Sequence, residues 1–389
     1  MSLQATYSDV AAPAQAARRA VYRPELDVLR FLAFFLVFLH HILPRQASGW
    51  GESYGVLADV LASVGNLCGY GLSLFFALSA FLITDLLRRE KDVAGDVHLR
   101  EFYVRRILRI WPLYFFGLGL GWINVLQSGD MNDVVMLTMF MFMIGNWYFQ
   151  SGEWSANPAT PLWSISIEEQ FYLVWPVTMK LLNRNGVFAA CAALAVLGLS
   201  VAFYLGESRA AVDTTVWTNT FVQFVTFAAG AALALHLNGR SPELSTLARM
   251  TLFLLGVVLW FASVHVLHAK QIMSAESGLK LAAGVAVSAI GSVVIVLSMV
   301  GARIDARNVL VYLGKISFGL YVFHLLAIDM TRHVHAALEQ MLDLRIPLTA
   351  FALLAIFPTI LMAVLSYRRL ETPFLRMKDK FTFVKSRPV

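Results

Sequence analysis

Long apolar runs separated by short polar stretches dominate the chain. The hydrocarbon core of a bilayer is about 30 Å thick and needs roughly 20 apolar residues in helical form. Eleven segments approach that length: 27–46, 67–87, 108–127, 133–150, 164–182, 186–206, 215–237, 248–268, 279–300, 310–331 and 346–367. The connections between them are short and leave no room for a long soluble domain. The pattern predicts an all-α fold, a polytopic transmembrane helical domain.

The placement of Lys and Arg predicts how the segments are oriented. Three basic residues precede the first segment, seven lie between residues 88 and 109, and seven lie between 368 and 387. Since basic residues mark cytoplasmic loops, both termini are expected in the cytoplasm. This requires an even number of crossings, so either 133–150 or 164–182 is expected to be re-entrant or interfacial. The resulting ten-helix arrangement places 24 of the 31 basic residues inside and six outside.

The composition supports a membrane protein and excludes several other classes. Apolar residues make up 58% of the chain and charged residues only 14%, against about 25% charged in a soluble domain. The mean hydropathy is +0.66. Both cysteines, Cys68 and Cys191, lie in apolar runs, which argues against a disulfide framework or a cysteine zinc site. The net charge of +6 is confined to loops and termini, which indicates contact with anionic lipid and no nucleic-acid partner.

The first segment carries ionisable residues on one helical face. Asp27 and Arg30 are three residues apart and are expected to pair. Eleven steps of about 100° separate Arg30 from His41, which returns to the same face about 16 Å along the axis. One interpretation is a functional wall of the helix. The other is an Arg that extends toward the lipid headgroups and a His that caps the far end.

Residues 161–176 form the most unusual stretch, because two adjacent glutamates and several polar groups lie among aromatic rings. Glu168 follows Ser164 by four residues and therefore shares its helical face. An interfacial aromatic belt explains the rings, Trp163 among them, but not the glutamates. We expect a functional role for this stretch.

Two further groups of residues allow both a structural and a functional interpretation. Ser317, Tyr321 and His324 share one stripe of a helix, which is typical of a polar seam between packed helices. The functional interpretation is a Ser–His pair of a hydrolase, but the sequence has no strand-turn-helix nucleophile elbow. Arg105, Arg106 and Arg109 lie at a predicted helix start near the membrane surface. They suit either contact with anionic lipid or a phosphate clamp. The chain has no Walker loop, no GxGxxG and no HExxH motif, and no metal site is expected.

Six blocks in the same order resemble the acyltransferase-3 family of integral membrane O-acyltransferases, which includes O-antigen, exopolysaccharide and macrolide acetylases. Arg30, ten residues and His41 are similar to the family's R-X10-H signature. The other blocks are 75–84, 102–114, 161–176, 313–324 and 367–374. The chain departs from the family at Val28, Phe31, Ala80 and Leu325–Leu326, which are packing positions.

The resemblance implies acyl transfer, commonly of acetyl, from acyl-CoA as a co-substrate to a hydroxyl group, with no tightly bound cofactor. The acceptor is expected to be a glycan or a lipid-linked saccharide. His41 is the expected general base, with Arg30 and Glu168 as its catalytic partners. The remaining expected roles are contact with CoA, for Arg105, Arg106, Arg109 and Tyr114, and contact with substrate, for Asp27, Trp163, Ser164 and His324.

We expect three parts along the chain: a mobile cytoplasmic tail at 1–22, the acyltransferase-3-like transmembrane domain at 23–376, and a basic cytoplasmic tail at 377–389. The expected location is the bacterial inner membrane. The alternative function is a proton-coupled secondary transporter, which would use the same intramembrane His, Glu and Arg. Transporters tend to carry paired repeats with interrupted helices, and the sequence has no convincing internal repeat.

Overall fold

The computed structural model describes residues 22–44, 46, 56–129, 131–152, 154–208, 213–269, 277–342 and 348–383. This part of the chain is almost entirely helical and contains no strand. The expected tail at 1–22 lies outside the described residues except for Tyr22, and the expected tail at 377–389 is described only as far as residue 383. The α-helices are α2 (Pro24–Ile42), α3 (Val56–Cys68), α4 (Gly71–Ala94), α5 (Leu99–Ser128), α6 (Met131–Met141), α7 (Leu162–Leu181), α8 (Arg184–Glu207), α9 (Asp213–Trp217), α10 (Thr220–Leu237), α11 (Thr246–His265), α12 (Gly278–Met299), α13 (Val309–Lys315), α14 (Ser317–Leu342), α15 (Leu348–Leu353), α16 (Ile356–Ser366) and α17 (Thr372–Lys378).

Helix length and composition confirm an all-α, multi-pass membrane protein. Six helical stretches in the described residues are long and apolar enough to cross a bilayer, or seven when the bent pair α13–α14 is taken as one span. Helices α2, α5 and α7 have 19, 30 and 20 residues, so they also have the length of a span. They are less apolar because they carry the ionisable and polar residues that the sequence singles out.

Of the two segments between which the sequence does not decide, 133–150 is the shorter helix. Helix α6 has 11 residues, about 16 Å, which is roughly half the thickness of the hydrocarbon core. The chain turns at Met143, whose φ of 58° is left-handed, and a 3-10 turn follows at Gly145–Ser151. Helix α7 is a full 20 residues. Helix lengths therefore favour 133–150 as the segment that does not span.

Two elements differ from the sequence-based expectation. The basic stretch 88–109 is mostly helical, because α4 continues to Ala94 and α5 already begins at Leu99. The expected segment 310–331 is bent by 78° between α13 and α14. A charged helix end extends beyond the apolar run that hydropathy detects, and a sharp bend leaves the apolar pattern unchanged. For these reasons neither feature was visible in the pattern.

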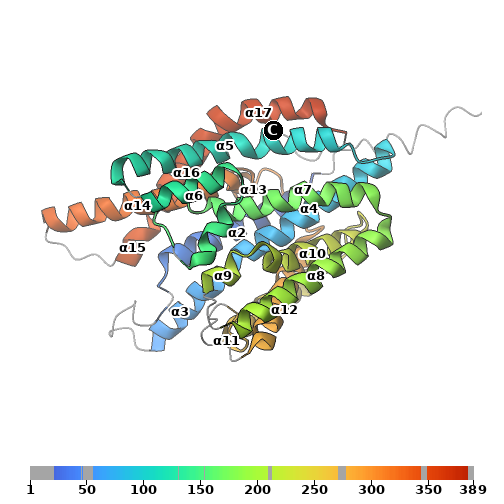
Figure 1. Ribbon diagram of the computed structural model, residues 1–389, viewed down its shortest axis with the longest axis horizontal. Helices are drawn as coiled ribbons and strands as arrows, with labels where there is room; N and C mark the ends of the chain where they lie inside the picture. The colour runs from blue at the N-terminus through green and yellow to red at the C-terminus, as the bar shows by residue number, and fades with distance from the viewer. Residues whose placement is uncertain are drawn as a thin grey trace, which may run out of the picture.

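Helix α4 runs through the middle of the molecule and packs against α2, α7, α10 and α12. Helices α8, α10, α11 and α12 lie on one side of it, and α5, α14, α16 and α17 on the other (Figure 1). The crossing of α4 and α10 is close. A Cβ atom on Gly230 would lie 2.2 Å from the carbonyl oxygen of Ala77, so backbone meets backbone there. This packing places α2, α4, α5, α7 and α14 around the cavity described below.

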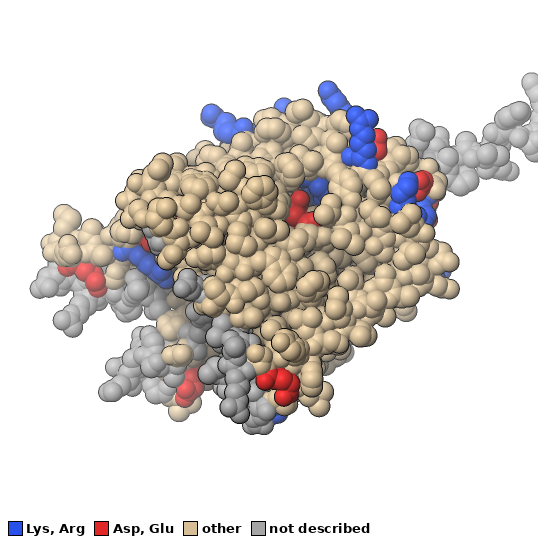
Figure 2. All heavy atoms as spheres, in the orientation of Figure 1, with Lys and Arg blue, Asp and Glu red and all other residues tan. Residues whose placement is uncertain are grey.

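The surface carries its charges unevenly. In Figure 2 most visible Lys and Arg lie along the edge formed by the start of α5, the end of α4 and α17, and a broad uncharged area separates them from the opposite end. Large apolar side chains are exposed on the described helices, among them Leu173 (64%) on α7, Leu254 (60%) on α11 and Phe357 (67%) on α16. Such an apolar surface fits contact with lipid tails.

Candidate functional site

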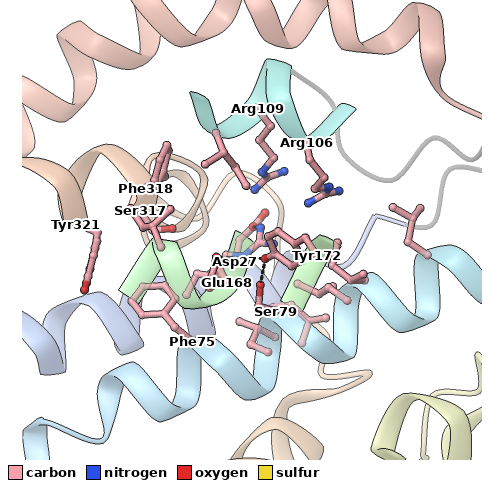
Figure 3. Close-up of a pocket in the computed structure, with 18 of the residues that line it drawn as sticks. Asp27, Phe75, Ser79, Arg106, Arg109, Glu168, Tyr172, Ser317, Phe318 and Tyr321 are labelled. Carbon is pink, nitrogen blue, oxygen red and sulfur yellow. Dashed lines mark hydrogen bonds and ion pairs between the residues drawn. The ribbon is translucent and has the colours of Figure 1, made fainter. Parts of the chain in front are cut away.

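A cavity of about 190 Å³ lies between α2, α4, α5, α7 and the start of α14 (Figure 3). Its wall is apolar along α4, with Leu72 and Phe75 among the lining residues. Five guanidinium groups line it, against three carboxylates. The arginines are Arg23, Arg30, Arg89, Arg106 and Arg109, and the acids are Asp27, Asp85 and Glu168. A cavity with this lining suits an anionic ligand that also has an apolar part.

Helix α2 contributes the expected pair of Asp27 and Arg30. The guanidinium of Arg30 donates to the carboxylate of Asp27 over 3.0 Å, which confirms the pairing inferred from the i,i+3 spacing. The hydroxyl of Tyr22 donates to the same carboxylate over 2.9 Å. Asp27 is nearly fully buried. Together these contacts fix Arg30 at the cavity wall.

Helix α7 places Ser164 and Glu168 in the cavity, as their i,i+4 spacing predicts. The carboxylate of Glu168 accepts a hydrogen bond from the hydroxyl of Tyr172 over 3.2 Å, and that hydroxyl also lies within hydrogen-bond distance of Ser79 on α4. The hydroxyl of Ser164 lies 2.7 Å from that of Tyr321 on α14. These hydrogen bonds therefore connect α7 to α4 and to α14 around the cavity.

Helix α5 separates the three predicted arginines. Arg106 and Arg109 line the cavity, and Figure 3 shows both side chains directed into it. Arg105 lies elsewhere. It is 4% exposed, pairs with Glu90 of α4 over 2.5 Å and donates to the carbonyl of Phe381 over 2.7 Å. Because Arg105 ties α5 to α4 and to the C-terminal segment, its position is that of a structural residue.

One side of the cavity faces the gap between α5 and α7. There Trp111 of α5 donates to Glu169 of α7 over 3.3 Å. The guanidinium of Arg106 lies over the ring of Tyr172, 5.7 Å from its centroid. In Figure 2 an acidic and a basic side chain are visible in a hollow in the uncharged surface at this place. Glu169 therefore lies between α5 and α7, while Glu168 lines the cavity.

His41 and His324 do not belong to the cavity lining. Their rings lie 5.1 Å apart, centroid to centroid, and His324 lies 5.4 Å from Tyr321, which does line the cavity. His324 is fully buried, and its Nδ1 lies 2.5 Å from the carbonyl oxygen of Tyr321. A carbonyl can only accept, so Nδ1 carries the proton and Nε2 presents a lone pair. No partner for that Nε2 is found in the described part of the chain.

The side chains of Tyr114 and Trp163 pack between helices and do not reach the cavity. Tyr114 is fully buried and its hydroxyl donates to the carbonyl of Phe140 over 2.7 Å, which ties α5 to α6. Trp163 is 4% exposed and packs edge to face against Trp154. Neither residue lines the cavity.

The structure adds lining residues that the sequence reasoning missed. Arg89 pairs with Asp85 over 2.8 Å, and Arg23 and Arg89 both donate to the carbonyl of Gly239, over 3.5 and 3.3 Å. Asp85 and Arg89 are spaced i,i+4 at the end of an apolar run, which is the signal that could have identified them. Ser317 and Tyr321 were noticed as a stripe but interpreted as a seam, and both line the cavity.

The lining favours an anionic group-transfer substrate over a metal. Within the described ranges, no three His, Cys, Asp or Glu side chains gather as metal ligands would. Guanidinium groups bind phosphate oxygens in a bidentate manner, and apolar residues beside them can hold a hydrophobic chain. A carboxylate and hydroxyl groups in the same space can orient a reacting alcohol or hold its proton.

Comparison with known proteins connects this geometry to a family. The chain is 25% identical over 406 residues to the peptidoglycan O-acetyltransferase OatA of Listeria monocytogenes, covering 95% of this chain and 60% of that protein. It is 26% identical over 377 residues to a Staphylococcus aureus protein named "Putative O-acetyltransferase", covering 91% of this chain and 57% of that protein. The chain thus spans less than two thirds of the length of these relatives. No solved structure matches significantly. The family model described as an acyltransferase domain matches residues 23–368, nearly the whole of the helical domain, and the chain therefore belongs to the acyltransferase-3 family.

Proposed function

We propose that this protein is a membrane O-acyltransferase that moves an acyl group, in the first place acetyl, from acyl-CoA to a hydroxyl of a glycan acceptor. The observation that carries the proposal is the cavity, which combines five arginines with an apolar wall. Membership of the acyltransferase-3 family favours this function over the proton-coupled transporter. The proposed location is the inner membrane of a bacterium, with both termini in the cytoplasm.

Acyl-CoA is the proposed donor because its parts match the lining. Its phosphates would meet guanidinium groups such as Arg106 and Arg109, which are well suited to phosphate oxygens. Its pantetheine chain would lie along Leu72, Phe75 and the other apolar residues of α4. Since Arg23 lies at the start of α2 and Arg89 near the end of α4, close to the basic helix ends, the donor would enter from the proposed cytoplasmic side.

The reaction forms one ester bond and breaks one thioester bond. The hydroxyl oxygen of the acceptor attacks the thioester carbonyl carbon, and the carbonyl electron pair moves onto its oxygen. When this oxyanion collapses, the carbon–sulfur bond breaks and the CoA thiolate leaves. The hydroxyl proton is taken by a general base and ends on the thiolate or in solvent.

His41 is the proposed general base, since an imidazole ordinarily titrates near pH 6.5. It lies beyond Tyr321 and His324 as seen from the cavity, so the acceptor would approach from the His41 end of α2 while the thioester approaches from the cavity. Glu168, which lines the cavity, would orient the acceptor hydroxyl, and Arg30 would stabilise negative charge.

The proposed acceptor is a hydroxyl of peptidoglycan or of another glycan. The relative in Listeria is named for peptidoglycan O-acetylation. A lipid-linked saccharide has the same hydroxyl chemistry and would also reach the site from the membrane.

Purified full-length protein in nanodiscs, supplied with acetyl-CoA and soluble peptidoglycan fragments, tests the proposal. Thiol release should depend on the fragments, and a fragment should gain the mass of one acetyl group. Solute uptake driven by a proton gradient, without thiol release, would instead support the transporter.

A further inference from the structure

The bend between α13 and α14 brings the start of a long helix to the cavity. The two helices meet at Ile316 at an angle of 78°, and α14 then continues for 26 residues from Ser317. Ser317 and Phe318, the first two residues of α14, both line the cavity. The N–H groups in the first turn of a helix have no acceptor within that helix, and the helix dipole places positive potential there.

The side chain of Ser317 provides a second, independent sign of a ligand. Ser317 is 5% exposed, it lines the cavity, and its hydroxyl has no hydrogen-bond partner among the described residues. Figure 3 shows Ser317 beside the space that Arg109 and Glu168 border. Because the residue is otherwise buried, its hydroxyl can complete its hydrogen bonding only from the cavity, where a polar group of a ligand would meet it.

Glycines hold this first turn rigidly in place. A Cβ atom on Gly314 would lie 1.8 Å from the carbonyl oxygen of Asp27, so α13 touches the backbone of α2 directly. A Cβ on Gly319 would lie 3.2 Å from Ala363 of α16. The start of α14 is therefore fixed between α2 and α16, next to the residue that orients Arg30. Fixed donors of this kind are what stabilises a charge that develops only during reaction.

The hydrogen-bond donors at the start of α14, the Ser317 hydroxyl and the backbone N–H groups, are uncharged and lie in a partly apolar part of the cavity. The ligand group that they bind must suit such surroundings. Phe75, Phe318 and Tyr321 lie at this end of the cavity, whereas Arg23 and Arg89 lie toward the charged ends of α2 and α4. Phosphate groups already carry charge and would be held by the arginines. A thioester carbonyl oxygen is neutral in the ground state and becomes negative when the acceptor attacks, so it fits the donors at the start of α14.

We propose that the Ser317 hydroxyl and the first-turn N–H groups of α14 form the oxyanion hole for the thioester carbonyl. This inference rests on the proposed acyl transfer. As the acceptor oxygen bonds to the carbonyl carbon, the electron pair that moves to the carbonyl oxygen is stabilised by these donors. The pair returns when the carbon–sulfur bond breaks and the thiolate leaves. Arg30 adds positive charge to the same space, which offsets the carboxylate of Glu168.

The test compares Ser317→Ala, Ser317→Thr and the matched control Ser298→Ala in the full-length protein. Ser298 is a buried serine on α12 whose hydroxyl donates to the carbonyl of Ile295, away from the cavity. Two quantities are measured: kcat for acetyl-CoA, and the Kd of S-ethyl-CoA, a thioether that has no carbonyl oxygen. Ser317→Ala should lower kcat about 10²-fold, in line with the loss of one oxyanion-hole donor, and leave the Kd unchanged.

The outcomes separate this inference from the proposed function. Ser317→Thr, which keeps the hydroxyl, should retain most of the turnover, and Ser298→Ala should match the wild type. A wild-type kcat in Ser317→Ala, or an equal loss of S-ethyl-CoA affinity, would overturn the oxyanion hole. A wild-type protein that binds S-ethyl-CoA but never turns over acetyl-CoA would instead overturn the proposed transfer.

Discussion

The imidazole rings of His41 and His324 lie 5.1 Å apart, centroid to centroid, although they come from α2 and α14. Tyr321 lines the cavity, and its ring lies 5.4 Å from that of His324. Arg30, on the same helix as His41, lines the cavity itself. In the proposed reaction, the half of α2 that carries Arg30 would contact the donor, and the half that carries His41 would contact the acceptor.

Replacing His41 by Ala should lower kcat about 10²- to 10⁴-fold, which is the usual contribution of a general base. The Kd of S-ethyl-CoA should not change, because His41 does not line the cavity. Turnover by thiol release and binding by calorimetry measure the two effects. His333→Ala is the matched control, since that histidine is on α14 with 78% of its side chain exposed. Full turnover in His41→Ala would remove His41 from the mechanism.

Replacing Arg106 or Arg109 by Ala should raise the KM for acetyl-CoA about 10-fold, since each would lose a charge-assisted hydrogen bond to a phosphate. S-acetylpantetheine, which lacks the nucleotide and its phosphates, is the matched substrate. Its kcat/KM should be the same for the wild type and both variants. Equal losses for both substrates would show that these arginines do not bind the nucleotide end.

Replacing Arg105 by Ala should destabilise the protein rather than weaken donor binding. Glu90 is 2% exposed and would lose its arginine partner, keeping only the N–H group and the nearby ring of His98. Breaking such a pair by removing one member costs about 3–5 kcal/mol. Thermal unfolding in detergent should therefore shift to lower temperature, while the KM of the remaining folded enzyme stays unchanged. A raised KM at wild-type stability would assign Arg105 to the donor site.

Cysteine labelling tests the proposed orientation. Ser151 follows α6 and Ser241 follows α10, and both are exposed. The native Cys68 and Cys191 are buried, so the background should be low. With both termini in the cytoplasm, Ser151→Cys should react with a membrane-impermeant maleimide in intact cells, and Ser241→Cys only after lysis. The reverse pattern would invert the arrangement.

Much of the fold follows from the chain's apolar pattern. The segments 164–182 and 186–206 coincide with α7 and α8 to within about two residues, because apolar length and short polar connections determine such helices. The left-handed Met143 that ends the turn after α6, and the bend at Ile316, do not alter hydropathy. The apolar pattern therefore could not decide which of 133–150 and 164–182 is the segment that does not span.

The candidate site could be predicted from the sequence where both residues of a pair lie on the same helix. Asp27 with Arg30, and Ser164 with Glu168, follow from spacing alone and lie together in the cavity. Spacing cannot show which neighbouring helix a residue faces. Arg105 and Arg106 are adjacent on α5, yet the first meets Glu90 and the second lines the cavity. In the same way, the position of His41 on α2 was expected, but its neighbour His324 comes from α14.

Transfer of isotope-labelled acetyl is the most direct measurement of the proposed function. Proteoliposomes containing the full-length chain are supplied with [13C2]acetyl-CoA on the side of the basic helix ends and with peptidoglycan fragments. Mass spectrometry should find the two labelled carbons in an ester on the fragments for the wild type, and no such ester for His41→Ala. Unlabelled fragments after complete mixing, from wild-type protein that binds S-ethyl-CoA, would contradict acyl transfer from CoA.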